Sequence, residues 1–332
     1  MSRKTKKLKN KLLVPFAWIG IALVMCFILW LPARGFLALS DFVAALMYVF
    51  DRRGKRRALE NLRILRGKRT DLKSVFLFDP DRAAYDATAA ERKIIRRSYC
   101  SMTRAVIYVL WSSVRAKKRC AQVGFLREDA LKFVRENRPV VTVSGHIGLW
   151  ENLPHLAFLE GHKMMSVSKE VGTGLMTKWL LQMRRSIGQE IVPATGAFKP
   201  LMAGIRNGRS LGLLVDQKVT PKHGGIWIRF LGVPMPAAPG PAFFAAKGKI
   251  PIVVAWSRLL KGNRYRGEPV DVISPEEARD IWGCTQRIAT DLERLVRRHP
   301  SCWILNYNYF STFPTPEDLR TLVERETKAG VK

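Results

Sequence analysis

Apolar positions near the N-terminus form long uncharged stretches rather than an amphipathic pattern. Leu12 to Leu31 contains 20 residues without a charge, which is the length of a helix that crosses a bilayer. Gly35 to Phe50 is a second apolar segment and contains a single charged residue, Asp41. We therefore expect residues 1–50 to form an N-terminal membrane anchor, and residues 51–332 to form a separate domain.

From residue 51 onward, short apolar runs alternate with segments of helical periodicity. Helical spacing predicts helices at Ala58–Leu65, Glu91–Lys118, Phe125–Asn137, Thr173–Ser186, Phe198–Asn207, Pro239–Lys247 and Pro275–Arg298. Apolar and β-branched runs predict strands at Val140–Val143, Lys163–Ser168, Glu190–Val192, Ser210–Val215, Ile226–Phe230, Ile250–Trp256 and Cys302–Tyr309. This alternation predicts an α/β fold, a mixed sheet flanked by helices, with an N-terminal membrane helix.

The net charge of the chain indicates what kind of partner it binds. The 332 residues include 57 Lys and Arg against 27 Asp and Glu, a net charge of +30, which favours an anionic partner. Six basic residues precede the first apolar stretch and five more lie between Arg52 and Arg57, where anionic lipid head groups would meet them. We therefore expect a membrane partner and no nucleic acid. The five cysteines show neither paired nor metal-binding spacing, as in a reduced, cytoplasmic protein.

The basic N-terminus should stay on the cytoplasmic side. A single crossing would then place the large domain outside the cytoplasm, away from a thioester donor. Three arrangements avoid this: the second apolar segment returns as a re-entrant arm, it lies along the membrane surface, or the first helix inserts only in part.

Candidate chemistry lies where the strand Val140–Val143 ends. Ser144 and Gly145 break that strand, and His146 follows at a strand-to-helix corner, the edge of the sheet where α/β enzymes place their reacting groups. Glu151 comes five residues later, on the first turn of the next helix. We expect Glu151 to accept a hydrogen bond from one ring nitrogen, which leaves the other nitrogen as a general base.

The segment Ser144-Gly145-His146-Ile147-Gly148-Leu149-Trp150-Glu151 resembles the first block of the bacterial lipid A biosynthesis acyltransferases, a branch of the His-X4-Asp/Glu glycerolipid acyltransferases. Further blocks occur in the family's order. They are the Arg-X3-Gly block at Arg184, the strand that ends in Asp216-Gln217-Lys218, and Phe230-Leu231-Gly232-Val233-Pro234. One departure concerns Trp303, which the family follows with a basic, aromatic stretch, whereas here the next residues, Ile-Leu-Asn-Tyr-Asn-Tyr-Phe, contain no arginine.

The resemblance implies an O-acyltransferase at the bacterial inner membrane, with its catalytic domain facing the cytoplasm. The expected donor is an acyl thioester on acyl carrier protein, and the expected acceptor is a hydroxyl of a lipid A precursor or another anionic lipid. No metal and no cofactor are expected. The catalytic residues would be His146, Glu151 and Arg184. The substrate-binding residues would be Asp216, Gln217, Lys218, Gly148, Trp150, Phe230 and Gly232.

The residues themselves suggest direct attack, because no Gly-X-Ser-X-Gly elbow is present to form an acyl-enzyme. His146 would take the proton of the acceptor hydroxyl. The oxyanion would be stabilised by Arg184, or alternatively by backbone NH groups near Gly148. Asp216 would organise Arg184 or a water, or else serve as a helix cap. Trp150, with Leu149 and the Phe243-Phe244 pair, would line an acyl groove or belong to the core.

Two other interpretations stay open. An acyltransferase with the same His-X4-Glu pattern can act on a lysophospholipid, an aminolipid or another glycolipid. Alternatively, the basic residues can serve a non-enzymatic protein that binds membranes, although the ordered α/β blocks argue against it.

Overall fold

A computed structural model describes residues 27–69, 71–136, 139–168, 181–186 and 188–330. Residues 12–26 of the predicted span Leu12–Leu31 lie outside these residues, and residues 27–30 are helical. Most of the predicted helix Thr173–Ser186 also lies outside them, and its residues 181–186 are helical.

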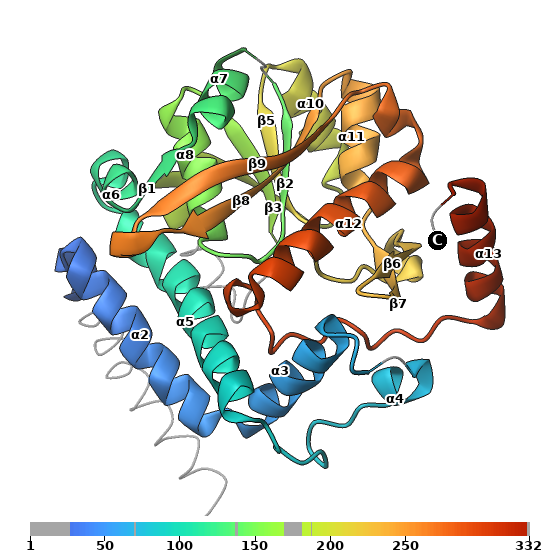
Figure 1. The fold of residues 1–332 in the computed structure, drawn as a ribbon. Helices are drawn as coiled ribbons and strands as arrows, with labels where there is room; N and C mark the ends of the chain where they lie inside the picture. Colours follow the sequence, from blue (N-terminus) through green and yellow to red (C-terminus); the bar gives the residue numbers. More distant parts are fainter. Residues whose placement is uncertain (1–26, 70, 137–138, 169–180, 187, 331–332) are drawn as a thin grey trace, which may run out of the picture.

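The centre of the fold is a seven-stranded sheet in the order β1-β9-β8-β2-β5-β3-β4 (Figure 1). Neighbouring strands are parallel except β8 and β9, so the predicted mixed sheet is confirmed. Its strands are β1 (Gly124–Leu126), β2 (Val141–Ser144), β3 (Met164–Ser168), β4 (Gln189–Pro193), β5 (Ser210–Leu214), β8 (Ile252–Leu259) and β9 (Tyr265–Ile273). Strand β2 is buried except at Thr142, because it lies in the middle of the sheet, where both faces are covered.

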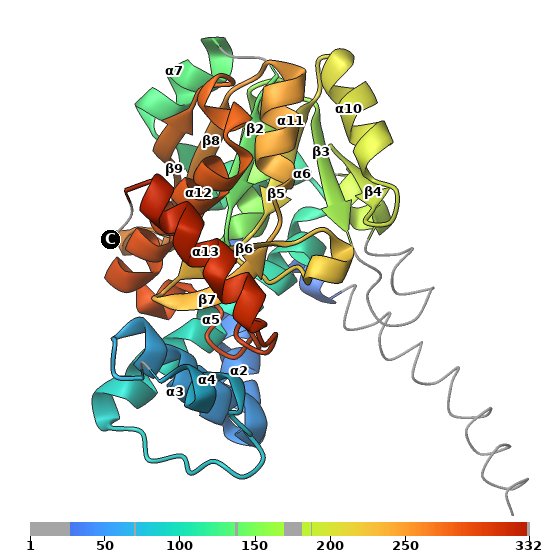
Figure 2. The same ribbon diagram turned by 90° about the vertical axis from the view of Figure 1, so that its right-hand side faces the viewer.

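Helices cover both faces of the sheet, as Figures 1 and 2 show. One face carries α6 (Ala116–Val123) and α8 (Leu153–Leu159), and α7 (Glu128–Glu136) packs on β9. The other carries α10 (Phe198–Arg206), α11 (Gly240–Gly248) and α12 (Ile281–Arg298). A two-stranded hairpin, β6 (Ile226–Phe230) and β7 (Val233–Ala237), packs against α12 and against the last helix, α13 (Pro316–Lys328). The apolar core fills the space between these layers.

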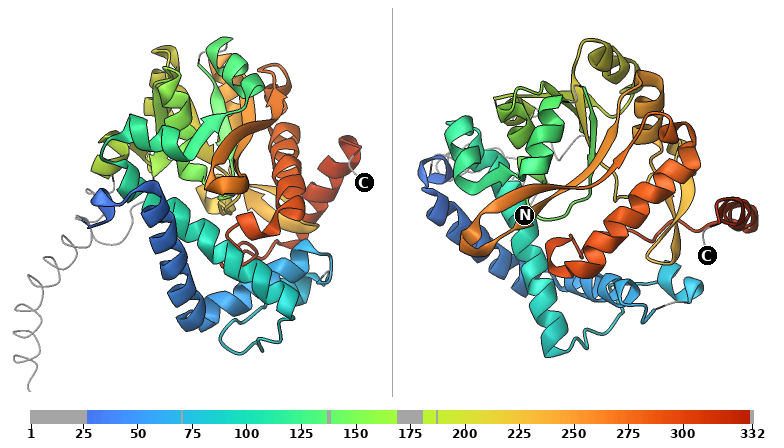
Figure 3. Two further views of the ribbon diagram at one scale, coloured as in Figure 1. Left: turned by 60° about the vertical axis from the view of Figure 1, so that its left-hand side comes forward. Right: turned by 45° about the horizontal axis from the view of Figure 1, so that its top comes forward.

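A helical layer closes the edge at which β2 and β5 end. It consists of α2 (Ala33–Phe50), α3 (Arg52–Leu65), the short α4 (Leu72–Phe76) and the long α5 (Ala89–Ser112), which begins at a capping box of Thr88 and Glu91. Helix α2 runs along α5, a packing that Figures 1 and 3 show from two sides. The Asp41 carboxylate accepts from the Arg104 guanidinium of α5 at 2.7 Å.

Helix α2 combines a buried and an exposed apolar face. Phe36 and Ala44 are fully buried against the layer, whereas Phe42 is 62% exposed and Phe50 is 77% exposed. By length and composition α2 is apolar enough to cross a membrane, and it is the only such helix among the described residues. One face of α2 packs on α5, and the opposite apolar face is open.

Several predicted elements differ from the structure. The helix Glu91–Lys118 is two helices, because Arg115 takes left-handed backbone angles (φ 55°) between α5 and α6. The helix predicted from Phe125 begins instead at Glu128, since the residues before it pair with β9. The helix predicted from Pro275 begins at Ile281, where the Asp280 side chain caps it. Strands β1, β7 and β9 were not predicted.

The last predicted strand, Cys302–Tyr309, was wrong. This segment returns across the edge of the sheet with a single bridge, between Ile147 and Trp303. Its aromatic residues are buried, Trp303 at 0% and Tyr309 at 1% exposure, because they pack beneath the end of β5 instead of within a ladder. Burial in a loop and burial in a strand leave the same apolar pattern in the sequence.

Candidate active site

His146 lies two residues beyond the end of β2. Gly145 forms the turn, and a side chain there would meet the Cβ of Asp216 at 3.1 Å. After His146 the chain enters a short 3-10 helix, Trp150–Asn152, and then α8. The imidazole ring packs edge-on against Trp150, with ring centroids 5.2 Å apart.

The partner of the imidazole is Asp216, which follows the neighbouring strand β5. The two atoms His146 Nδ1 and Asp216 Oδ1 are 2.7 Å apart. The Asp216 side chain has no exposed surface, whereas 19% of the His146 side chain remains exposed. The other carboxylate oxygen of Asp216 accepts from the indole Nε1 of Trp303 at 2.9 Å, and the hydroxyl of Tyr309 lies 3.5 Å away.

This arrangement sets the protonation of both groups. Burial opposes charge on His146, but the nearby Asp216 carboxylate and its hydrogen bond outweigh burial and raise the pKa of His146 above its ordinary value. Burial likewise opposes ionisation of Asp216, but His146 and the donors around it lower the pKa of Asp216 below its ordinary value. An ionised Asp216 accepts from Nδ1–H and therefore leaves Nε2 as the basic nitrogen.

The basic nitrogen faces a polar side chain. The amide nitrogen of Gln217 lies 3.5 Å from His146 Nε2, too far for a strong hydrogen bond. An acceptor hydroxyl that binds Nε2 would therefore also meet Gln217.

The expectation that Glu151 accepts from the His146 ring was wrong. Glu151 Oε1 instead accepts from the Arg184 guanidinium at 2.6 Å, and Arg184 also donates to the Ser168 hydroxyl at 3.3 Å. Both partners of the pair are mostly buried, with 12% of the Glu151 and 19% of the Arg184 side chain exposed. The structure thus forms two acid–base pairs, His146 with Asp216 and Arg184 with Glu151. Asp216 neither organises Arg184 nor caps a helix.

The backbone amides near Gly148 already have acceptors. Gly148 donates to the Cys302 carbonyl at 2.8 Å, and Ile147 donates to the Gly145 carbonyl at 2.7 Å. Gly148 also has a positive φ of 67°, and a Cβ there would lie 1.9 Å from the Ser257 carbonyl oxygen. Gly148 is therefore needed for the close approach of two backbone segments, and the amides named as alternative oxyanion donors are occupied.

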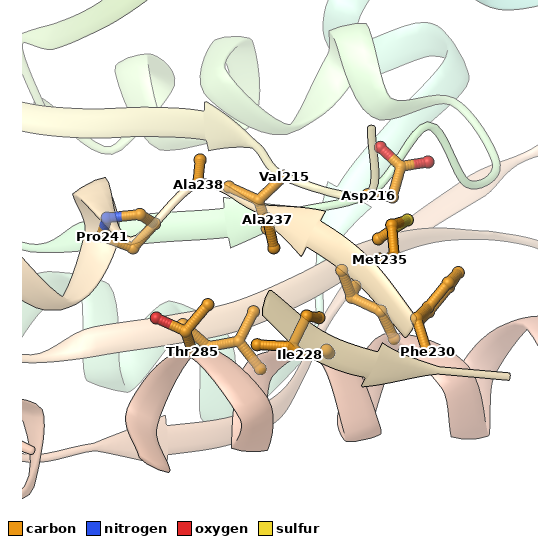
Figure 4. Close-up of a pocket in the computed structure, with 12 residues that line it drawn as sticks. Val215, Asp216, Ile228, Phe230, Met235, Ala237, Ala238, Pro241 and Thr285 are labelled. Carbon is orange, nitrogen blue, oxygen red and sulfur yellow. The ribbon is translucent and has the colours of Figure 1, made fainter. Parts of the chain in front are cut away.

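The other residues predicted to bind substrate or to line an acyl groove are part of the packed structure. Trp150 and Leu149 belong to a core cluster with α2 and α5, and Phe244 is buried in the main core, whereas Phe243 is 40% exposed. Gly232 forms the tight turn between β6 and β7 with φ 81°. Phe230 packs edge-on against Trp303 and lines a small enclosed cavity between the hairpin, α12 and Asp216 (Figure 4).

That cavity has a volume of about 10 Å³, room for one water molecule but not for an acyl chain. Lys218, the remaining predicted residue, contacts the Ser311 hydroxyl beside the site. Sequence reasoning missed Trp303 and Tyr309 as partners of Asp216. The available signal was a polar-flanked cluster of aromatic residues near the C-terminus.

Comparison with known proteins places this site within one family. The family model described as bacterial lipid A biosynthesis acyltransferase matches residues 83–312. No curated protein matches the chain. The matched range covers more than half of the chain and includes both acid–base pairs and Trp303. The chain therefore belongs to the bacterial lipid A biosynthesis acyltransferases.

Proposed function

We propose that this protein transfers a fatty acyl chain from an acyl thioester on acyl carrier protein to a hydroxyl of a lipid A precursor or a related glycolipid. The observation that carries the proposal is the buried Asp216 carboxylate on Nδ1 of His146, which leaves Nε2 as a base at a partly open edge of the sheet. This is the arrangement that activates a hydroxyl nucleophile.

The reaction follows from these positions. Nε2 of His146 takes the proton of the acceptor hydroxyl as its oxygen attacks the thioester carbonyl, and Asp216 stabilises the imidazolium that forms. The tetrahedral oxyanion then collapses, the carbon–sulfur bond breaks, and the thiolate takes the proton from the imidazolium. The products are the ester and the free thiol.

Arg184 is our candidate for stabilising the oxyanion. Its guanidinium is held between Glu151 and Ser168, so its charge is fixed before substrate binds. A good fixed donor is worth about 3 kcal/mol in the transition state. Glu151 then acts as a positioning residue for Arg184, and Gln217 contacts the acceptor hydroxyl.

The same geometry would serve a lysophospholipid, an aminolipid or another glycolipid as acceptor. Two neighbouring surface features support a lipid as the acceptor. The exposed apolar face of α2 and the basic residues from Arg52 to Arg57 lie in adjacent helices. We propose that this face docks on the bacterial inner membrane from the cytoplasmic side, where acyl carrier protein is available.

The test compares lipids of cells that carry the wild-type gene, His146→Ala or no gene, by mass spectrometry. Acylated lipid A precursor should appear with wild type only. The matched control is His223→Ala, because His223 is exposed and contacts only Thr220 among the described residues. Full product from the His146 variant would refute the mechanism, and a new acyl chain on a glycerolipid instead would refute the acceptor.

A further inference from the structure

Helix α3 is hydrogen-bonded to residues 303–311, which we call the returning segment. The Asn61 side chain donates to the carbonyls of Leu305 at 2.6 Å and Tyr307 at 2.8 Å. Arg57 precedes Asn61 by four residues, so the two side chains lie on the same face of the helix. Arg57 is therefore turned toward the same returning segment.

Lys218 reaches that segment from the other side. It follows Asp216 and Gln217 directly, and its Nζ donates to the Ser311 hydroxyl. From Trp303 to Ser311 the segment itself contains no basic residue. Positive charge around this segment thus comes from two places far apart in sequence, α3 and the end of β5. Lys218 directly follows Gln217, whose amide nitrogen lies 3.5 Å from His146 Nε2.

Burial and the charge of Arg53 lower the pKa of Arg57 by more than the Asp81 and Asp51 carboxylates raise it, so the charge of Arg57 is only partly compensated. Among the described residues neither Arg57 nor Lys218 forms an ion pair, although both are partly buried. Burial lowers the pKa of Lys218, and the charge of Arg57 lowers it further. The acids nearest Arg57 have other partners: Asp81 pairs with Arg53, and Asp51 accepts from Gly54 and Tyr99.

We propose that Arg57, Lys218 and the Ser311 hydroxyl form a phosphate-binding site beside the catalytic histidine, which takes a phosphate group of one of the two substrates. A planar guanidinium, an ammonium and a hydroxyl together supply the donors that phosphate oxygens accept. A bound phosphate would neutralise Arg57 and Lys218, neither of which forms an ion pair among the described residues. The inference rests on the proposed acyl transfer. Lys218 and Ser311 lie within the matched family range, whereas Arg57 lies outside it.

Two sources of phosphate are possible, a phosphorylated sugar of the acceptor and the phosphopantetheine arm of the donor. Their chemistry is the same, so the experiment separates them. Purified full-length enzyme in detergent is assayed with an acceptor that carries phosphate and with the same acceptor after dephosphorylation. The donor is either acyl phosphopantetheine or the acyl thioester of N-acetylcysteamine, which has no phosphate.

Arg57→Gln and Lys218→Gln should each lower kcat/KM for the phosphate-bearing substrate by about 10- to 100-fold, the usual value of a charge-assisted hydrogen bond. The loss should appear in KM, and it should vanish with the matching substrate that lacks phosphate. Dependence on the acceptor phosphate assigns the site to the acceptor, and dependence on the donor phosphate assigns it to the donor. The control, Arg320→Gln, removes the same charge from the exposed face of α13 and should change neither.

A second readout does not need turnover. Inorganic phosphate at constant ionic strength should raise the Tm of wild type and of Arg320→Gln but not of Arg57→Gln. The inference is overturned if Arg57→Gln loses the same factor with and without substrate phosphate and if phosphate stabilises it as it does wild type. That result would leave acyl transfer by His146 intact, whereas inactivity of wild type with every acceptor would refute the proposed function itself.

Discussion

Asp216→Asn removes one charge and one acceptor at the point where three groups meet. In the wild type, one carboxylate oxygen accepts from His146 Nδ1 and the other accepts from Trp303 Nε1. An asparagine has only one oxygen, so its NH2 group must face one of these two donors. If it faces His146, it donates to Nδ1 and moves the ring proton to Nε2, which can then no longer act as a base.

The magnitude follows from the 2.7 Å contact. Two unit charges at that distance interact by about 6 kcal/mol at an effective dielectric constant of roughly 20. Desolvation of the imidazolium offsets part of this gain. We therefore expect the transition state to lose about 3–5 kcal/mol, which lowers kcat by about 10²- to 10⁴-fold.

The alternative orientation puts the NH2 group against the indole of Trp303 and leaves a buried donor without a partner, at a cost of about 1–3 kcal/mol. Trp303→Phe removes that conflict. In this second background the NH2 group can turn to the Tyr309 hydroxyl, which lies 3.5 Å from the same carboxylate oxygen. Asp216→Asn should therefore cost less when it is combined with Trp303→Phe than when it is made in the wild type.

The assay is steady-state acyl transfer by the four proteins of this double-mutant cycle, with thermal unfolding to verify that each is folded. Asp216→Asn within tenfold of wild type would refute the assignment of Asp216 as the partner of the base. Strictly additive losses would show that Trp303 does not act through Asp216.

Four further outcomes are expected. Because the neutral imidazole is the base and its pKa is raised, kcat/KM should fall as pH drops through a pKa above 6.5, and Asp216→Asn should move this limb to lower pH; a wild-type limb below 6.5 would contradict the assignment. Glu151→Ala should lower turnover by about 10²- to 10⁴-fold, and adding Arg184→Ala should cost little more, because the two residues act as a unit; additive losses would contradict this. Removing residues 1–50 should lower the Tm more than removing residues 1–26, because the layer then loses the buried face of α2, at about 1.5–3 kcal/mol for each large side chain; equal Tm values would show that α2 adds no stability. Acyl carrier protein should outperform coenzyme A as donor at low salt, with a lead that shrinks as salt rises, since the net charge of +30 steers acidic partners; preference for coenzyme A at every salt concentration would exclude the carrier protein.

The sequence identified the strands of the central sheet more reliably than it identified the partner of His146. Glu151 was chosen because it is five residues away, whereas Asp216 is 70 residues away. The register explains the outcome. Ser144 of β2 lies beside Leu214 of β5, so residues two positions beyond each strand end meet at the same edge of the sheet. Recognising 140–143 and 210–215 as parallel neighbours would have paired His146 with Asp216.

The donors to Asp216 were harder to find. Trp303 and Tyr309 lie in an aromatic segment whose burial resembles that of a strand, and no local pattern shows which polar group an indole will meet. Strand β9 was also missed, because it alternates charged and apolar residues beside an edge strand and contains Pro269.

The position of the returning segment in the chain affects the order in which the active site forms during synthesis. Its hydrogen bonds join residues far apart in the chain: Asn61 to Leu305 across 244 positions, and the Ser98 hydroxyl to the Trp303 carbonyl across 205. Trp303 and Leu305 are synthesised after the strands of the sheet, so the nascent sheet holds His146 and Asp216 for some time without the indole that donates to the buried acid. Long-range closure of this kind is slow compared with helix formation. Catalytic competence should therefore arise only after synthesis of the segment that contains Trp303.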